Sequence, residues 1–140
     1  MIEGMVAGLA AKLEENPSDY QGWVRLARSY TVLGQPEPAR DAMANAATAA
    51  PANIDILTLY ARSIRAAAGN KPTMESVAVM QNLLRLAPSN VEALFFVGLA
   101  AAEAGDSAEA RRRWQKAQAG VPNGSDEYKV LQRQIDGLSK

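Results

Sequence analysis

Three arginines and two apolar residues are the side chains whose types and spacing best suit binding chemistry. Arg28, Arg62 and Arg65 are expected on neighbouring helices, and guanidinium groups favour bidentate pairing with carboxylates. Phe95 and Leu99 would add an apolar floor on a later helix. Together these residues suit an amphipathic helix, or a chain end with a carboxylate, held in a groove. The alternative is that the arginines are merely solvated and that Phe95 packs against a C-terminal helix.

Catalytic chemistry has little support. The 140 residues include no cysteine and no histidine, which removes thiol nucleophiles, Cys/His zinc sites and the commonest general base. Ser29, Ser63 and Ser76 therefore lack a histidine partner. The carboxylates are not paired as a hydrolase requires, and there is no glycine-rich phosphate loop. We expect Trp23 and Trp114 to serve packing, and we expect no enzyme activity, metal or cofactor.

Charge and length narrow the class further. Lysine plus arginine and aspartate plus glutamate number 15 each, so the formal net charge is zero. Nucleic-acid binders normally carry a basic excess that neutralises phosphates, so we expect no nucleic-acid partner. A chain of 140 residues with 48% hydrophobic residues is expected to form one globular domain.

The opening stretch, residues 1–13, is apolar but does not read as a secretory signal. Glu3 lies where positive charge is expected, and Lys12 follows too soon. No apolar run approaches the roughly 18 residues needed to cross a membrane. Any targeting or anchoring segment is expected to lie outside this sequence.

Prolines recur along the chain at regular intervals. Pro17, Pro51, Pro88 and Pro122 are separated by 34, 37 and 34 residues. Each follows one helical pattern and precedes another, and proline cannot continue a helix interior. A fixed period of this length indicates a repeat architecture.

Within one period the residues follow a definite signature. An apolar stripe on a first helix is followed by a turn and by a second stripe, and the residues concerned are Trp23, Leu26, Ala27, Tyr30, Gly34, Pro36, Ala39, Met43 and Ala46. This arrangement resembles the tetratricopeptide-repeat (TPR) signature. A later period repeats it in register with Leu94, Val97, Gly98, Ala101, Gly105, Ala110, Trp114 and Ala117. The small residues Ala27 and Gly98 suit close approach of two helices.

The repeats divide the chain into five parts of one predicted TPR domain, 1–140. They are an N-terminal helix (1–16), repeat 1 (20–53), a degenerate repeat 2 (54–90), repeat 3 (91–124) and a C-terminal capping helix (125–140). Repeat 2 has a long turn over residues 68–73. The expected fold is an all-α TPR solenoid of three helical hairpins with two flanking helices.

Short polar motifs predict where helices begin. Ser18 with Gln21 and Ser89 with Glu92 fit capping boxes that open first helices. Thr73 is a suitable N-cap for the helix after the long turn.

First helices of TPR hairpins line the concave surface, so their residues outside the packing stripe are the candidate peptide-binding groove. These residues are Gln21, Val24, Arg28, Thr31, Thr58, Arg62, Arg65, Phe95 and Leu99.

Longer segments point to a particular family. They are Met5-Val-Ala-Gly-Leu-Ala-Ala-Lys-Leu-Glu-Glu-Asn-Pro-Ser-Asp, Gly22-Trp-Val-Arg-Leu-Ala-Arg-Ser-Tyr-Thr-Val-Leu-Gly, Asn90-Val-Glu-Ala-Leu with Gly98-Leu-Ala-Ala, Arg113-Trp-Gln-Lys and Val121-Pro-Asn-Gly-Ser-Asp-Glu. With the long second turn, they resemble the C-terminal domain of the CcmI (CycH) family, whose layout NrfG shares. The resemblance covers essentially the whole chain.

The resemblance implies a periplasmic chaperone of c-type cytochrome maturation. Members of the family bind the C-terminal helix of apocytochrome c and present its haem-binding segment to the haem-ligation components. An N-terminal membrane portion would precede this domain in the full-length protein. The alternative is a structural TPR scaffold that assembles a bacterial envelope complex through its convex face or by self-association.

Overall fold

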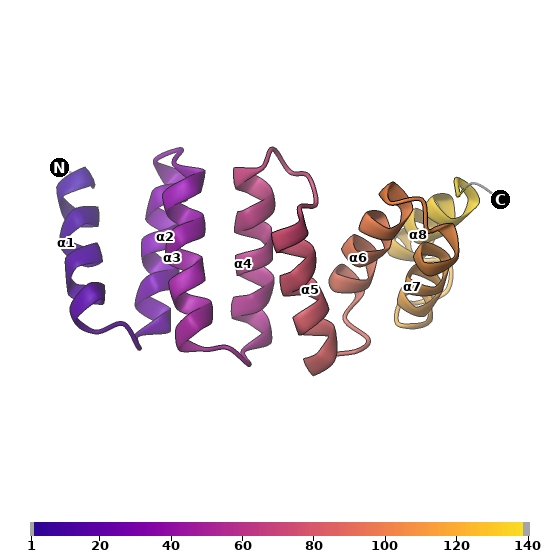
Figure 1. Cartoon of the computed structure of the whole chain (residues 1–140), viewed down its shortest axis with the longest axis horizontal. Coiled ribbons are helices and arrows are strands. Elements are labelled where there is room, and N and C mark those ends of the chain that lie inside the picture. The colour runs from indigo at the N-terminus through magenta and orange to yellow at the C-terminus, as the bar shows by residue number, and fades with distance from the viewer. Residues whose placement is uncertain (1, 139–140) are drawn as a thin grey trace. The chain divides into compact units, whose positions relative to one another are not determined.

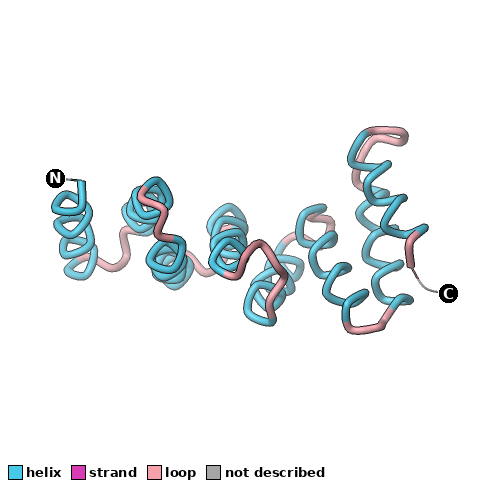
Figure 2. Tube along the Cα trace, turned by 90° about the horizontal axis from the view of Figure 1, so that it is seen from above, coloured by secondary structure: helices cyan, strands magenta, loops and turns pink. Residues whose placement is uncertain are grey.

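The computed structural model describes residues 2–138, and all of their regular structure is helical (Figure 1). In chain order the helices are α1 (Ile2–Glu15), α2 (Tyr20–Val32), α3 (Pro36–Ala49), α4 (Ile54–Ala67), α5 (Met74–Leu86), α6 (Val91–Glu103), α7 (Ser107–Ala119) and α8 (Asp126–Asp136). Figure 2 shows these helices joined by loops, with no strand in the described part. The all-α prediction is confirmed. Within residues 2–138, no helix has both the length and the apolar character needed to cross a membrane.

The chain divides into two compact units, unit 1 (residues 1–71) with α1–α4 and unit 2 (residues 72–140) with α5–α8. The division falls in the long turn expected over residues 68–73, so α4 and α5 belong to different units. The single domain expected for 1–140 therefore stays a prediction.

Side-chain caps set where most helices begin. Thr73 accepts the Ser76 backbone N–H at 3.1 Å, and the Ser76 hydroxyl accepts the Thr73 N–H at 2.8 Å, which confirms the N-cap predicted for α5. Asn53 of α4 and Ser125 of α8 cap in the same way, each accepting the N–H three residues later.

The capping boxes predicted for the first helices at Ser18 and Ser89 are wrong. The N-caps are the next residues, and Asp19 and Asn90 each accept an N–H three residues on, from Gly22 and Ala93, at 3.0 Å. The helices begin at Tyr20 and Val91, one residue later than the boxes required. Both the aspartate and the asparagine are strong N-caps, so the later start satisfies the first turn equally well.

Glycines end the first helices of repeats 1 and 3. Gly34 and Gly105 have φ of 71° and 85°, a left-handed conformation that costs glycine little. The next residue donates its N–H back across the turn in both repeats, from Gln35 to the Tyr30 carbonyl at 2.9 Å and from Asp106 to the Ala101 carbonyl at 2.8 Å. The two repeats therefore use the same turn, as their sequences predict.

Unit 1 packs α2 against α3, α3 against α4 and α1 against α2. Its buried core includes Val6, Leu13, Trp23, Leu26, Ala27, Ala39, Ala42, Met43, Ala46 and Ile56. Trp23 donates its indole N–H to the Pro17 carbonyl at 3.0 Å, which ties α2 to the loop before it. The Leu13 side chain packs so close to Gly22 that a Cβ there would lie 2.5 Å from it.

Unit 2 is built around Trp114, which is only 1% exposed. Helix α7, which carries it, packs against both α6 and α8, and α5 packs against α6. A Cβ at Gly98 would overlap the Trp114 indole, which confirms that a small residue is needed where the two helices approach. The indole N–H donates to the Phe95 carbonyl at 3.0 Å. Both tryptophans are core residues, as the sequence predicts.

Candidate functional site

Unit 1 contains a groove between its first helices, α2 and α4, with α3 beneath. We call it the α2–α4 groove; its volume is about 480 Å³. Its lining residues are Val24, Ala27, Arg28, Thr31, Val32, Met43, Leu59, Arg62, Ser63 and Ala66. Such a volume lies within the ~300–1,000 Å³ that is usual for ligand pockets.

The α2–α4 groove combines an apolar floor with two cations. Met43 is buried and Leu59 is half-buried, whereas Arg28 and Arg62 are exposed, one from each wall. Exposed guanidinium groups beside an apolar surface can pair with carboxylates while apolar side chains occupy the floor. The groove therefore suits an amphipathic segment that carries acidic groups.

The structure brings four of the nine candidate residues together in this groove, namely Val24, Arg28, Thr31 and Arg62. Three others from unit 1 lie outside its lining. Gln21 is exposed on α2, and Thr58 donates its hydroxyl to the Ile54 carbonyl at 2.9 Å.

Arg65 lies outside the lining as well, because it is buried in α4 and only 8% exposed. Arg65 follows Arg62 by three residues, and three residues rotate a helix by about 300°, so its side chain starts about 60° away from that of Arg62. That rotation is enough to move the guanidinium from the groove wall into the protein.

Some groove residues were not anticipated from the sequence. Met43 comes from a second helix, where only packing was expected, and Leu59 and Ser63 directly follow Thr58 and Arg62 on α4. A candidate set that also contained the residue after Thr58 and the residue after Arg62 would have included Leu59 and Ser63.

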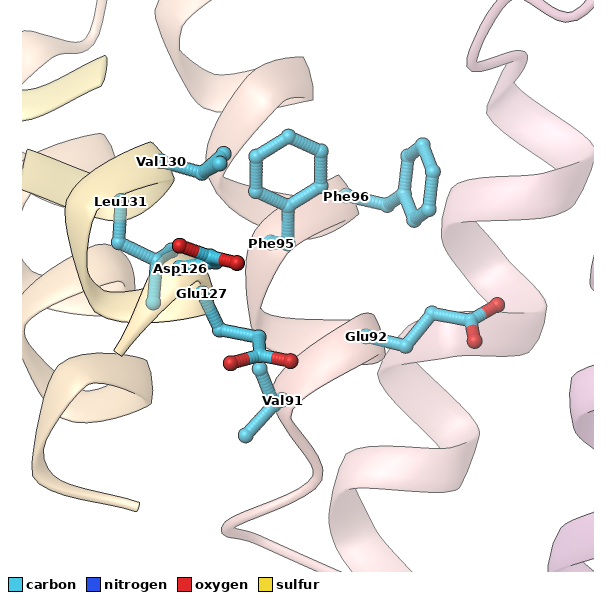
Figure 3. Close-up of a pocket in the computed structure, with 8 residues that line it drawn as sticks. All are labelled: Val91, Glu92, Phe95, Phe96, Asp126, Glu127, Val130 and Leu131. Carbon is cyan, nitrogen blue, oxygen red and sulfur yellow. The ribbon is translucent and has the colours of Figure 1, made fainter. Parts of the chain in front are cut away.

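Unit 2 contains a second groove, between α6 and α8, which we call the α6–α8 groove. Its volume is about 370 Å³. Its lining residues, all drawn in Figure 3, are Val91, Glu92, Phe95, Phe96, Asp126, Glu127, Val130 and Leu131. Phe95 is the one candidate residue in this lining, and Leu99, the ninth candidate, is half-buried outside it.

Phe95 both packs and lines the groove. Its ring contacts Phe96 edge-to-face with centroids 5.2 Å apart, and the Trp114 ring at 6.4 Å. Its side chain shares the groove with Val130 and Leu131 of the C-terminal helix, yet it is only half-buried. The two alternatives stated for Phe95, packing and a groove floor, are thus compatible in this geometry.

The part of the chain that the structure describes offers no cluster of metal-ligating side chains. Among residues 2–138, no group of three or more aspartate or glutamate side chains is placed to hold a metal ion.

Helical hairpins that share a glycine turn, with a groove between the first helix of a hairpin and the helix that follows it, are typical of a TPR protein. The chain matches the family described as "Cytochrome c-type biogenesis protein H TPR domain" over residues 2–128. It therefore belongs to that family, and the family resemblance seen in the sequence is confirmed.

Curated relatives carry corresponding names. The chain is 27% identical over 131 residues to the cytochrome c-type biogenesis protein CcmH of Escherichia coli (strain K12), covering 94% of this chain and 37% of that protein. It is 50% identical over 52 residues to CycH of Rhizobium meliloti (strain 1021), covering 37% of this chain and 14% of that protein. The chain thus spans well under half the length of these relatives.

Solved structures support the fold. The crystal structure of MamA superposes with a TM-score of 0.72 at 15% identity, covering 97% of this chain and 78% of that one. The Sgt2 TPR domain from Aspergillus fumigatus superposes with a TM-score of 0.62 at 20% identity, covering 84% of this chain and 80% of that one. At these identities the likeness concerns the fold alone, and the predicted TPR solenoid class is confirmed.

Proposed function

We propose that this chain is a non-catalytic, protein-binding chaperone module of c-type cytochrome maturation. It holds the C-terminal helix of apocytochrome c in a groove and presents the polypeptide to the haem-ligation components. It acts in the periplasm as part of a longer, membrane-anchored protein.

The observation that carries the proposal is the α2–α4 groove in a chain of the cytochrome-biogenesis TPR family. Helix-in-groove recognition needs an apolar floor for one face of the peptide and polar groups at the edges for its flanks. Met43 and Leu59 provide the floor, and Arg28 and Arg62 stand at the two walls.

The names of the relatives support the cellular setting. Both CcmH and CycH are called cytochrome c-type biogenesis proteins. A protein that holds a polypeptide needs no chemistry of its own, which agrees with a sequence that has no cysteine or histidine.

Calorimetric titration with a synthetic peptide that copies the last helix of a c-type apocytochrome from the same organism tests the proposal. Arg62→Glu should weaken binding about tenfold, because it removes one attraction at the groove wall and adds a repulsion. Arg28→Glu should have a similar effect from the opposite wall.

Arg25→Glu is the matched control. Arg25 lies on α2, three residues from Arg28, is exposed and does not line the groove, and the substitution changes the net charge equally. Equal losses for Arg25→Glu and Arg62→Glu would show a general charge effect and remove the groove assignment. Absence of binding by the peptide and by the intact apoprotein would remove the cytochrome client and leave the scaffold alternative.

A further inference from the structure

The α6–α8 groove has an open apolar floor that is held rigidly. Phe95 and Phe96 project from α6, and Val130 of α8 lies on the side of Phe95 away from Phe96 (Figure 3). Val130 is 37% exposed and lines the groove. The backbone under Phe95 is fixed by the indole N–H of Trp114, which itself is fully packed. An exposed apolar surface on a rigid support is typical of an interaction site.

The polar groups of this groove are acidic. Asp126 and Glu127 are exposed in the first turn of α8, on the α8 side of the groove, and Glu92 extends along the side that carries Phe96 (Figure 3). The lining holds three carboxylates and, within the described residues 2–138, no basic residue. Lys129 and Arg133 of α8 are exposed but lie outside it. A partner with basic residues beside its apolar ones would complement this surface.

Helix dipoles account for only part of this arrangement. Carboxylates in the first turn of a helix stabilise its N-terminus, so Asp126 and Glu127 also favour α8. That role requires neither the open apolar floor beside them nor a valine side chain exposed on it. The combination of the floor and the carboxylates is what points to a partner.

We propose that the α6–α8 groove is a second docking site, which takes a basic amphipathic helix from a partner protein. Apolar side chains of that helix, spaced one turn apart, occupy the floor formed by Phe95, Phe96 and Val130. Its lysine or arginine residues lie next to Asp126 and Glu127. Because the described residues include no strand whose edge an extended peptide could join, helix-in-groove docking is the recognition mode that fits. This inference goes beyond the proposed function, since it assigns a basic ligand to unit 2, whereas the α2–α4 groove suits a segment that carries acidic groups.

Titration of the full chain with three synthetic peptides of roughly 18 residues, long enough for appreciable helicity, tests the inference. The first carries leucines at i, i+3 or i+4 and i+7, with lysines beside them. The second replaces every lysine with glutamate, and the third keeps the lysines but replaces the leucines with serine. The first peptide should bind and should shift backbone amide NMR signals of α6 and α8. The other two should bind at least about tenfold more weakly, because each lacks one of the two complementary features.

Variants of the groove give a second readout. Glu127→Lys should weaken binding of the lysine peptide about tenfold, and the neutral pair Asp126→Asn with Glu127→Gln should reduce the salt dependence of binding. Glu103→Lys is the matched control, because Glu103 lies at the far end of α6, is exposed and does not line the groove. Circular dichroism establishes that each variant is folded, and Val130→Lys replaces Glu127→Lys if the latter unfolds.

Three results would overturn the inference. The first is equal binding of the lysine and glutamate peptides. The second is an equal loss of lysine-peptide binding in Glu103→Lys and Glu127→Lys. The third is that the lysine peptide shifts amide signals of unit 1 only. If the chain binds the lysine peptide but not the apocytochrome peptide, the proposed client is ruled out and this second site remains.

Discussion

The two grooves occupy equivalent places in their units but differ in charge. Each lies between the first helix of a hairpin and the helix that follows that hairpin, α2 with α4 in unit 1 and α6 with α8 in unit 2. Arg28 and Arg62 are the charged residues of one lining, whereas Glu92, Asp126 and Glu127 are those of the other. The repeat determines where a groove forms, and residues outside the repeat signature determine what it can bind.

The floors of the two grooves also differ. Met43 and Leu59, both flexible aliphatic side chains, form the floor in unit 1, whereas Phe95 and Phe96 contribute two aromatic rings in unit 2. Aromatic rings offer a larger and more rigid contact area than aliphatic side chains. We therefore expect the α6–α8 groove to be preformed and the α2–α4 groove to adapt to its ligand.

The largest effect is expected from Trp114→Ala. Removing a fully buried tryptophan should lower the free energy of unfolding of unit 2 by about 3–5 kcal/mol, because a large cavity remains and the hydrogen bond from the indole N–H to the Phe95 carbonyl is lost. The remaining tryptophan, Trp23, lies in the core of unit 1, so its fluorescence reports on that unit alone. Urea denaturation of this variant should show loss of helical circular dichroism before the Trp23 signal changes.

The same experiment tests the single-domain prediction. If Trp23 fluorescence and circular dichroism change together in the Trp114→Ala variant, the two units unfold as one cooperative domain. In that case the Trp114→Ala variant should bind both the lysine peptide and the apocytochrome peptide more weakly. If the units unfold separately, only the lysine peptide should be affected.

A reversal of charge in unit 1 is expected to have an intermediate effect. The double variant Arg28→Glu with Arg62→Glu gives the α2–α4 groove the acidic character of the α6–α8 groove. The chain should then bind a second equivalent of the lysine peptide, with an affinity gain at unit 1 of about tenfold, or about 1.4 kcal/mol. The stoichiometry from calorimetry and amide shifts in α2 and α4 measure this.

An unchanged stoichiometry in that double variant would mean that floor shape, and not charge, separates the two grooves. Arg25→Glu serves again as the control, since it adds the same charge to α2 outside the groove.

Much of this comparison could be predicted from the sequence, because the repeat signature constrains the packing. The turns of repeats 1 and 3 require a left-handed conformation at Gly34 and Gly105, and the Trp114 indole leaves no room for a side chain at Gly98. The first-helix positions Val24, Arg28 and Arg62 follow from the same register. These features depend on local spacing, which a sequence displays directly.

Other features depend on neighbours that spacing does not reveal. The C-terminal helix was expected only to cover the end of the stack, so the acidic wall formed by Asp126 and Glu127 was not anticipated. The burial of Arg65 depends on a small rotation about the axis of α4. The Ser18 and Ser89 caps were misplaced because the adjacent Asp19 and Asn90 are equally good N-caps, and only the backbone shows where each helix begins.

The smallest effects are expected from removing the caps of the two groove helices. Asn53 caps α4 in unit 1 and Ser125 caps α8 in unit 2. Each substitution by alanine should cost about 1 kcal/mol. The consequences should differ, because α4 has 14 residues and packs on α3, whereas α8 has only 11 residues and packs mainly on α7.

Hydrogen exchange measures that difference. Ser125→Ala should speed amide exchange over the first turn of α8 and weaken the lysine peptide about threefold, since Asp126 and Glu127 are positioned by that turn. Asn53→Ala should speed amide exchange in α4 alone and leave the affinity for the lysine peptide unchanged. If Ser125→Ala speeds exchange but does not alter binding, the carboxylates of α8 serve the helix and not a ligand, and the contrast in charge between the grooves has no role in recognition.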